Sequence, residues 1–165
     1  VTGCAQLPLE PDTGGEVSAL LPTSMSWRAS GKMLVTSNSN NQTLRFSWTH
    51  SANIADRVVV SDSLGLRSAV LLHHKNGFFT VDSDNRLTPL SNAITARHLA
   101  LLEMTTPENW AALLTGTQLD SETVVAQVLD WSTLDTYRVP RRLRIEANDD
   151  LLRVMISKWD VISDE

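Results

Sequence analysis

The sequence predicts an α+β protein in which antiparallel strands form one sheet and two short helices are inserted between them. Apolar and polar residues alternate over several segments, and polar turn sequences separate these segments. Two stretches in the middle of the chain instead repeat apolar residues at helical spacing. A period of two is typical of a strand that buries one face, and a period near 3.6 is typical of a helix. If such a sheet curls, the helices can cover its concave face.

The first two strands are expected to form a hairpin. Thr43–Thr49 alternates strictly, and the polar stretch Ser37–Gln42 before it is typical of a turn, so Trp27–Val35 is the predicted partner strand. The apolar face of the second strand consists of Leu44, Phe46 and Trp48.

A meander of shorter strands is expected next. Arg57–Val60 leads into the turn Ser61–Gly65, and Leu66–Leu72 leads into the turn His73–Gly77. The strand Phe78–Asp82 then completes the meander.

Two helices are predicted in the middle of the chain. In the first, Ile94, His98, Leu101 and Leu102 recur at helical spacing. The second begins at Thr106 and Pro107, an N-cap followed by proline at the first helical position. Gly116 can supply its left-handed C-terminal residue.

The last part of the chain returns to strands. Leu143 and Ile145 alternate with charged residues, and the turn Asn148–Asp150 follows. A final strand then places Leu152, Val154 and Ile156 on one face.

Composition bounds the function. A chain of 165 residues with one cysteine is most simply one domain, able to bury about 70% of its extended surface without disulfides. The formal net charge of −5 argues against nucleic-acid binding, which needs a basic face. It also argues against electrostatic attachment to an anionic membrane, because no run of four or more Lys and Arg residues occurs. No apolar stretch approaches the roughly 18 residues that cross a bilayer.

The chain begins with Val1-Thr2-Gly3-Cys4, which has the pattern of a bacterial lipobox. Such a cysteine receives a lipid through its sulfur, and the alternative is an ordinary free cysteine in a frayed terminus. Three prolines and two adjacent glycines follow, so no long helix is expected. We therefore predict a tether over residues 1–26 and one folded domain over residues 27–165.

Catalytic and metal-binding patterns were not found, so we expect no enzymatic activity, no metal and no cofactor. His73 and His74 fall at a predicted hairpin tip, where solvent exposure is the simpler interpretation. His50 and His98 have no ligand partner one helical turn away, and paired aspartates fall in turns.

Two features suggest a function in addition to a structural role. Leu64 stands between the turn residues Ser63 and Gly65, so it is either an exposed apolar tip or folded back into the core. The sequence also has five tryptophans against one tyrosine. These indoles either fill a core, which is the default, or line an apolar cavity.

The order of motifs resembles the LolB family of outer-membrane lipoprotein receptors. These motifs are the lipobox cysteine, W-x-A-x-G-K at Trp27–Lys32, L-x-F-x-W at Leu44–Trp48, D-R-V-V-V at Asp56–Val60 running into S-L-G, P-E-N-W-A-A-L-L-T-G at Pro107–Gly116, and the closing segment Val139–Trp159. The resemblance implies an incompletely closed antiparallel β-barrel whose apolar cavity is covered by short helices. It also implies a receptor that takes lipoprotein acyl chains from a LolA-like periplasmic carrier and inserts them into outer-membrane lipid.

The resemblance assigns roles to particular residues. Cys4 would carry the lipid anchor, with the protein facing the periplasm. Leu64 and Gly65 would form the membrane-insertion loop. The ligand cavity would be lined by Leu44, Phe46, Trp48, Val58 and Val60.

The sequence departs from this family in two places. The long amphipathic helix expected before the first strand is missing or short, and Ser121–Tyr137 is short where the family often has extra strands. Two other functions therefore remain open: a lipid-anchored carrier of another amphiphile, and an envelope scaffold lipoprotein without a ligand.

Overall fold

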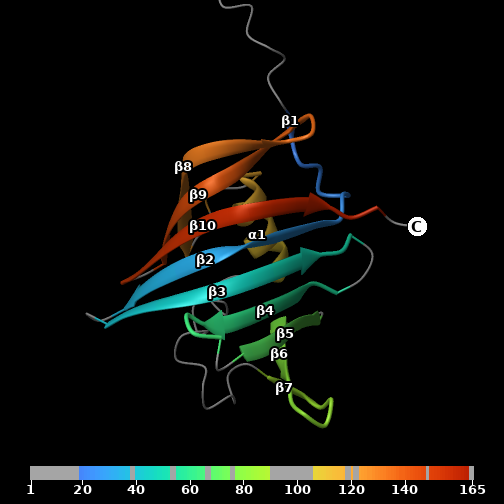
Figure 1. Cartoon of the computed structure of the whole chain (residues 1–165), viewed down its shortest axis with the longest axis vertical. Coiled ribbons are helices and arrows are strands. Elements are labelled where there is room, and N and C mark those ends of the chain that lie inside the picture. Colours follow the sequence, from blue (N-terminus) through green and yellow to red (C-terminus); the bar gives the residue numbers. More distant parts are fainter. Residues whose placement is uncertain are drawn as a thin grey trace, which may run out of the picture.

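One curved sheet of ten strands wraps around a single described helix (Figure 1). The computed structural model describes residues 19–37, 40–52, 55–65, 68–74, 77–89, 106–117, 120, 123–147 and 149–163. The elements are β1 (Ala19–Leu20), β2 (Trp27–Ser37), β3 (Asn40–His50), β4 (Arg57–Asp62), β5 (Ser68–His74), β6 (Gly77–Val81), β7 (Leu87–Pro89), α1 (Pro107–Thr115), β8 (Val124–Leu134), β9 (Tyr137–Ala147) and β10 (Asp150–Val161).

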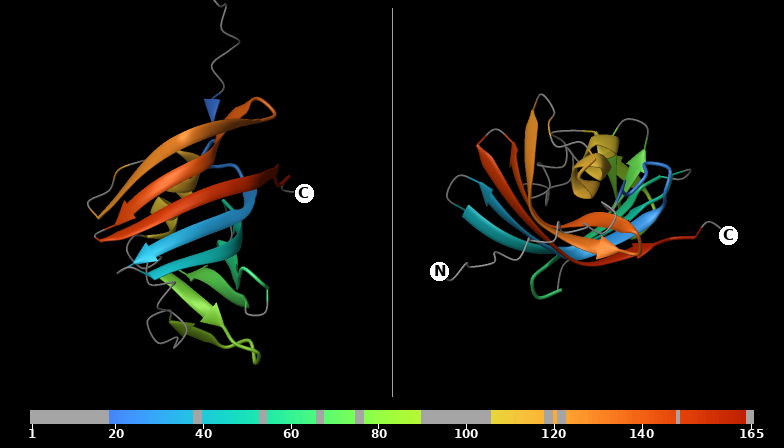
Figure 2. Two further views of the ribbon diagram at one scale, coloured as in Figure 1. Left: turned by 60° about the vertical axis from the view of Figure 1, so that its left-hand side comes forward. Right: turned by 90° about the horizontal axis from the view of Figure 1, so that it is seen from above.

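The sheet is antiparallel except at one end. Its strand order is β1-β9-β10-β2-β3-β4-β5-β6-β7, with β8 paired to β9 off this path, and only β1 runs parallel to its partner β9 among the pairings described. No pairing in the described part joins β7 to β1 or β8, so the sheet stays open. Figure 2 shows the sheet curving as a trough with α1 inside it.

Alternation along the strands builds the concave core. In one cross-strand row Ala29 lies opposite Trp48, and Trp48 lies opposite Val58, and all three are at most 2% exposed. The residues between them on each strand face outward. The predicted hairpin of two strands before residue 50 is therefore confirmed, and so is the strand meander that follows it.

Helix α1 has the ends that the sequence predicts. The Thr106 hydroxyl accepts a hydrogen bond from the Asn109 backbone N–H at 3.3 Å, and proline occupies the first turn. Gly116 ends the helix in the left-handed region at φ 75°, where it donates to the Leu113 carbonyl. The buried face of the helix consists of Trp110, Ala111, Leu113 and Leu114. This face packs against the concave side of the sheet.

Three expectations need correction or fall outside the described residues. Strand β8 lies within 121–137, where no strand was predicted. β1 pairs with β9 and Leu21 is 1% exposed, so the folded part begins before Trp27. The predicted helix around Ile94–Leu102 lies outside the described residues. The described part is thus an open, mostly antiparallel sheet with one short helix, and no helix in it is long and apolar enough to cross a bilayer.

Candidate functional site

The turn between β4 and β5 exposes a leucine. Leu64 is 78% exposed, more than any other large apolar side chain in the described part of the chain. The Gly65 N–H donates to the Asp62 carbonyl at 3.1 Å, and Gly65 has a φ of 72°. This φ favours glycine and lets the turn close tightly, so that the residue before it projects outward. Of the two interpretations of Leu64, the exposed one is confirmed.

A pocket of about 270 Å³ lies between α1 and the ends of β2 and β3. One wall is the segment 21–23 together with Trp27, and the other is the face of α1 that carries Ala111 and Ala112. His50, Glu108, Thr115 and Thr117 add polar atoms to the lining. The small alanines leave room beside the indole, and the volume is near the lower end of small-molecule sites. The pocket can hold a short apolar group with a polar end.

His50 belongs to a buried polar cluster beside this pocket. The His50 Nδ1 lies 2.8 Å from Oδ1 of Asp56, and the Trp48 indole N–H donates to Oδ2 of Asp56 at 3.0 Å. Asp56 is 3% exposed, and its backbone carbonyl accepts from the His73 N–H at 2.8 Å. Trp27 stacks on the His50 ring with centroids 5.2 Å apart. One carboxylate thus connects β3, the start of β4 and the pocket wall.

The environment of His50 favours its charged form. Burial lowers the pKa of His50, but the hydrogen bond with Asp56, the charge of Asp56 and a backbone hydrogen bond with Thr23 together raise it above 6.5. The pocket wall therefore holds an imidazolium paired with a carboxylate at mildly acidic pH.

The raised pKa of His50 predicts a stability that falls as pH rises. The stabilisation is fully present below the unfolded pKa of about 6.5 and is lost as pH rises through the folded pKa. We expect the melting temperature to fall as pH rises above about 6.5 because the ion pair loses its cation. Thermal melting followed by circular dichroism measures this. The same slope in His50→Gln would contradict the assignment to His50.

His73 is not the solvated turn residue that the sequence predicts. It lies within β5, its side chain is 16% exposed, and its Nε2 lies 3.5 Å from Oε1 of Glu108 in the first turn of α1. Its ring also contacts Phe78 at 6.4 Å between centroids. The strand continues two residues further than expected, so His73 keeps the inward direction of Leu71 and reaches the helix.

The five predicted cavity residues lie together on the concave face. Leu44, Phe46, Trp48, Val58 and Val60 are at most 5% exposed and belong to the packed core. None of them lines the pocket described above, whose lining includes Leu21 and His50 instead. Their contact with an acyl chain stays a prediction. Cys4, the predicted lipid attachment site, lies outside the described residues.

The tryptophans divide between core and partly exposed positions. Trp27, Trp48 and Trp110 are at most 2% exposed, as the core-filling interpretation predicts. Trp131 stacks under the Arg138 guanidinium at 4.0 Å, and the Trp159 N–H donates to the Pro140 carbonyl at 2.8 Å.

In the described part of the chain, no three His, Cys, Asp or Glu side chains come close enough to bind a metal ion.

The sequence singles out Leu64 as a candidate exposed leucine but misses the polar cluster and the pocket. Leu64 could be found because turn residues flank it. The His50–Asp56 pair is separated by six residues and matches no motif. The Leu21 wall lies in the segment that was interpreted as a tether, and its only sequence signal is the short apolar patch Val17–Leu21.

Comparison with known proteins identifies a fold. No protein-family model matches the chain, and no curated protein sequence matches it. A LolA-superfamily protein from Nitrosomonas europaea aligns with a TM-score of 0.56 and 8% identity, over 86% of this chain and 88% of that one.

Two further solved structures align less closely. A DUF1329 family protein from Desulfovibrio piger aligns with a TM-score of 0.46 and 6% identity, over 86% of this chain and 89% of that one. A domain assigned to outer membrane lipoprotein sorting in Vibrio parahaemolyticus aligns with a TM-score of 0.40 and 9% identity, over 86% and 87%. At these identities, the similarity of the Nitrosomonas protein identifies the fold alone. The chain has a LolA-like fold, an open antiparallel sheet curved around a helix.

Proposed function

We propose that this protein is a LolB-like receptor of the bacterial envelope. It would accept the acyl chains of lipoproteins from a LolA-like periplasmic carrier and insert them into the outer membrane, held there by a lipid on Cys4. The observation that carries the proposal is Leu64, an apolar side chain 78% exposed at the tip of a tight turn in a LolA-like fold. Transfer of an exposed leucine side chain from water into a membrane is favourable.

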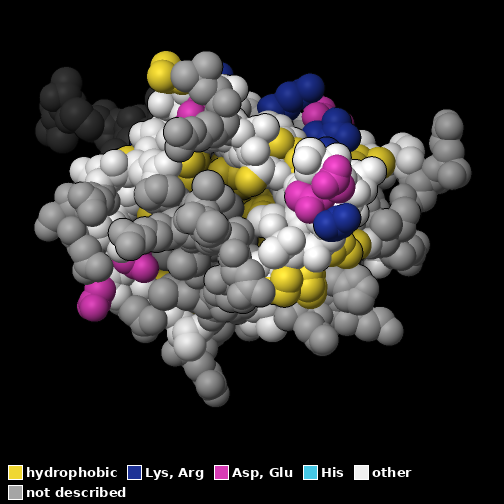
Figure 3. All heavy atoms as spheres, turned by 90° about the horizontal axis from the view of Figure 1, so that it is seen from below, with side chains coloured by type: hydrophobic (Ala, Val, Ile, Leu, Met, Phe, Trp, Pro, Cys, Tyr) yellow, Lys and Arg dark blue, Asp and Glu magenta, His cyan; other side chains and the backbone are white. Residues whose placement is uncertain are grey.

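The concave side supplies an apolar environment for acyl chains. The side chains of β2, β3 and β4 that are fully buried in the described part of the chain are apolar, and Trp27 lines the pocket beside α1. Moving one methylene group of an acyl chain from water into an apolar site is favourable by about 0.8 kcal/mol. An acyl chain is therefore held by many weak contacts that add up. Figure 3 shows hydrophobic side chains reaching the surface at the lower end of the molecule.

Transfer by this route needs no covalent chemistry, so we propose a protein without enzymatic activity. The acyl chain leaves the protein when a bilayer offers at least equal burial. Leu64 brings the protein to that bilayer because its side chain is already exposed at the turn between β4 and β5. The free energy of the step comes from apolar burial alone.

Leu64→Glu is expected to keep the fold and lower lipoprotein insertion into vesicles by at least about tenfold. A carboxylate at this tip removes the apolar contact, about 1.5–3 kcal/mol for a leucine, and adds a charge that resists entry into the bilayer. The measurement is transfer of an acylated lipoprotein from a LolA-like carrier to vesicles, separated by flotation.

Leu129→Glu is the matched control because it makes the same change at another exposed leucine. Leu129 is 51% exposed on β8, which pairs with β9, and three strands lie between β9 and β4. The control should transfer lipoprotein like the unchanged protein. Equal transfer by both variants would refute the role of Leu64, and mass spectrometry of co-purified lipid would show whether another amphiphile is carried.

A further inference from the structure

We propose that the convex face of the sheet, beside the Leu64 turn, binds the anionic headgroups of membrane phospholipids. This inference rests on the proposed function, since it names the membrane surface on which the turn acts. The surface consists of Arg142, Lys32 and Arg45 in one cross-strand row, with Arg144 and Arg153 in the next row. We call these five residues the basic patch.

Strand pairing assembles the basic patch from four strands. Arg142 lies opposite Met155, Met155 opposite Lys32, and Lys32 opposite Arg45. Arg153 lies opposite Arg144 one row further along. Directly opposed residues on one face have Cβ atoms about 5 Å apart. Lys32 therefore lies beside Arg45 and Arg153 beside Arg144, with Met155 between Lys32 and Arg142. All five side chains are exposed.

The convex face concentrates positive charge in an acidic protein. Eight of the 14 Lys and Arg residues lie on this face in the described strands, together with three acidic residues. The basic residues are Arg28, Lys32, Arg45, Arg57, Arg142, Arg144, Arg153 and Lys158, and the acidic residues are Asp130, Glu146 and Asp160. The face therefore has a formal charge of +5, eight minus three, in a chain whose total is −5. A local field of this kind attracts anions even when net charge opposes it.

Three of the five cations of the basic patch are not neutralised by neighbouring carboxylates. Arg142 lies 3.6 Å from Asp130, and Arg144 is ion-paired with Glu146 at 2.6 Å. Among the described residues, no Asp or Glu oxygen lies within 4.0 Å of Lys32, Arg45 or Arg153. These three cations remain available to an external anion.

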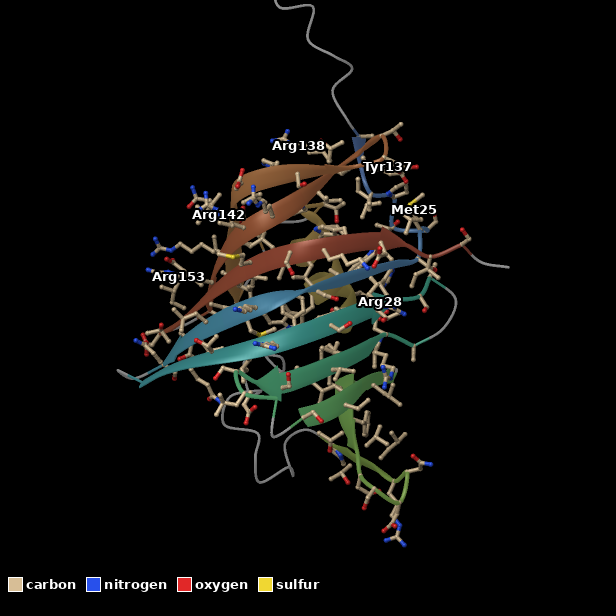
Figure 4. All side chains as sticks on the ribbon, viewed as in Figure 1. Met25, Arg28, Tyr137, Arg138, Arg142 and Arg153 are labelled. Atoms are coloured by element: carbon tan, nitrogen blue, oxygen red, sulfur yellow. The ribbon has the colours of Figure 1, made fainter. Side chains whose placement is uncertain are left out.

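The position of the patch favours a membrane over an acidic protein as its partner. Arg45 lies opposite Ser61, three residues before Leu64, so the Arg45 end of the basic patch is the end nearest the apolar tip. Met155, 54% exposed, stands between Lys32 and Arg142 and adds an apolar contact. A phospholipid surface offers phosphates beside hydrocarbon, which is the same pairing of chemistries. Figure 4 shows Arg142 and Arg153 toward one end of the sheet and Arg28 toward the other.

The test is binding of the full chain to vesicles of phosphatidylcholine with and without phosphatidylglycerol, measured by co-sedimentation. We expect phosphatidylglycerol to strengthen binding and salt to weaken it. Lys32→Gln combined with Arg45→Gln should weaken binding to the anionic vesicles roughly 30-fold, since each cation near an anionic surface contributes about 1 kcal/mol.

The matched control is Arg28→Gln combined with Arg57→Gln, which removes the same charge from the other end of the same face. Arg28 and Arg57 flank Thr49, roughly 13 Å along the strands from the row of Lys32, more than the Debye length of about 8 Å. This control should bind within about threefold of the unchanged protein, and circular dichroism should show both variants folded.

Each outcome has one meaning. Equal loss in both double variants, or unchanged binding in the Lys32 and Arg45 variant, overturns the proposed patch; the second result would leave an acidic protein as the partner. Leu64→Glu separates the two hypotheses because it should block insertion yet keep most salt-sensitive binding to anionic vesicles. Failure of Leu64→Glu to affect insertion, with the charge effects intact, would refute the receptor function and leave the headgroup site standing.

Discussion

Replacing Asp56 with alanine is expected to lower the free energy of unfolding by about 3–4 kcal/mol. The substitution leaves the buried Trp48 indole N–H without its 3.0 Å acceptor and the raised-pKa His50 without its counter-ion. Asp56 is 3% exposed, so water cannot easily replace the lost carboxylate. Urea unfolding followed by tryptophan fluorescence measures the change.

Asp56→Asn is the matched control because it keeps an oxygen acceptor of the same size. Trp48 should retain its hydrogen bond, while His50 loses the charge that raises its pKa, so we expect about half the loss of the alanine variant. The Asn variant should also lose most of the fall in melting temperature that is expected above about pH 6.5. An alanine variant as stable as the original would show that the cluster contributes nothing.

Gly31→Ala is the second substitution with a large expected effect, a loss of about 3 kcal/mol or more. A Cβ at Gly31 would overlap the Met155 backbone oxygen and lie 2.9 Å from the Ile156 Cα. The neighbouring strand cannot simply move away, because β10 has a register shift between Ile156 and Lys158 at this point. The Ser157 hydroxyl donates to the Ser30 carbonyl at 3.1 Å and holds that bulge in place.

Gly65→Ala provides the comparison for Gly31. Nothing lies within 4 Å of a Cβ placed there, so only the backbone strain of its φ of 72° opposes the change, about 1 kcal/mol. Guanidinium unfolding of the two variants should show the difference. Similar small losses in both would mean that β2 and β10 separate to accept the methyl group.

The local elements were predictable because their signals are local. The β2–β3 hairpin follows from the alternation of Leu44, Phe46 and Trp48, and both ends of α1 follow from Thr106, Pro107 and Gly116. The flanking residues of Leu64 predict a turn, and the structure decides between the two interpretations by showing the side chain exposed. In each case the deciding interactions connect residues a few positions apart.

The missed elements depend on partners far away in the sequence. β8 pairs with β9 along its whole length despite two register shifts, which break the alternation that would identify it from sequence. β1 has only two residues, and it is a strand because Tyr137 and Arg138 lie beside it. The pocket forms only where α1 meets residues 21–23.

The distribution of charge also depends on strand pairing, which the sequence alone does not show. A net charge of −5 without a run of four cations argues against an anionic membrane, yet the sheet places Lys32, Arg45 and Arg142 in one row. Alternation places every second residue outward, and pairing then aligns outward residues from distant strands, so no window of sequence contains the cluster.

The sequence by itself determined that β2, β3, β9 and β10 contain strands with one apolar face, where α1 begins and ends, and that Leu64 stands in a turn. Tertiary structure alone decided that β10 and β9 follow β2 in the sheet, and with it the LolA-like fold, the buried His50–Asp56 pair and the basic convex face. The physical reason is that hydrophobic periodicity and turn chemistry act within a few residues, whereas strand order depends on how the whole sheet buries its apolar face.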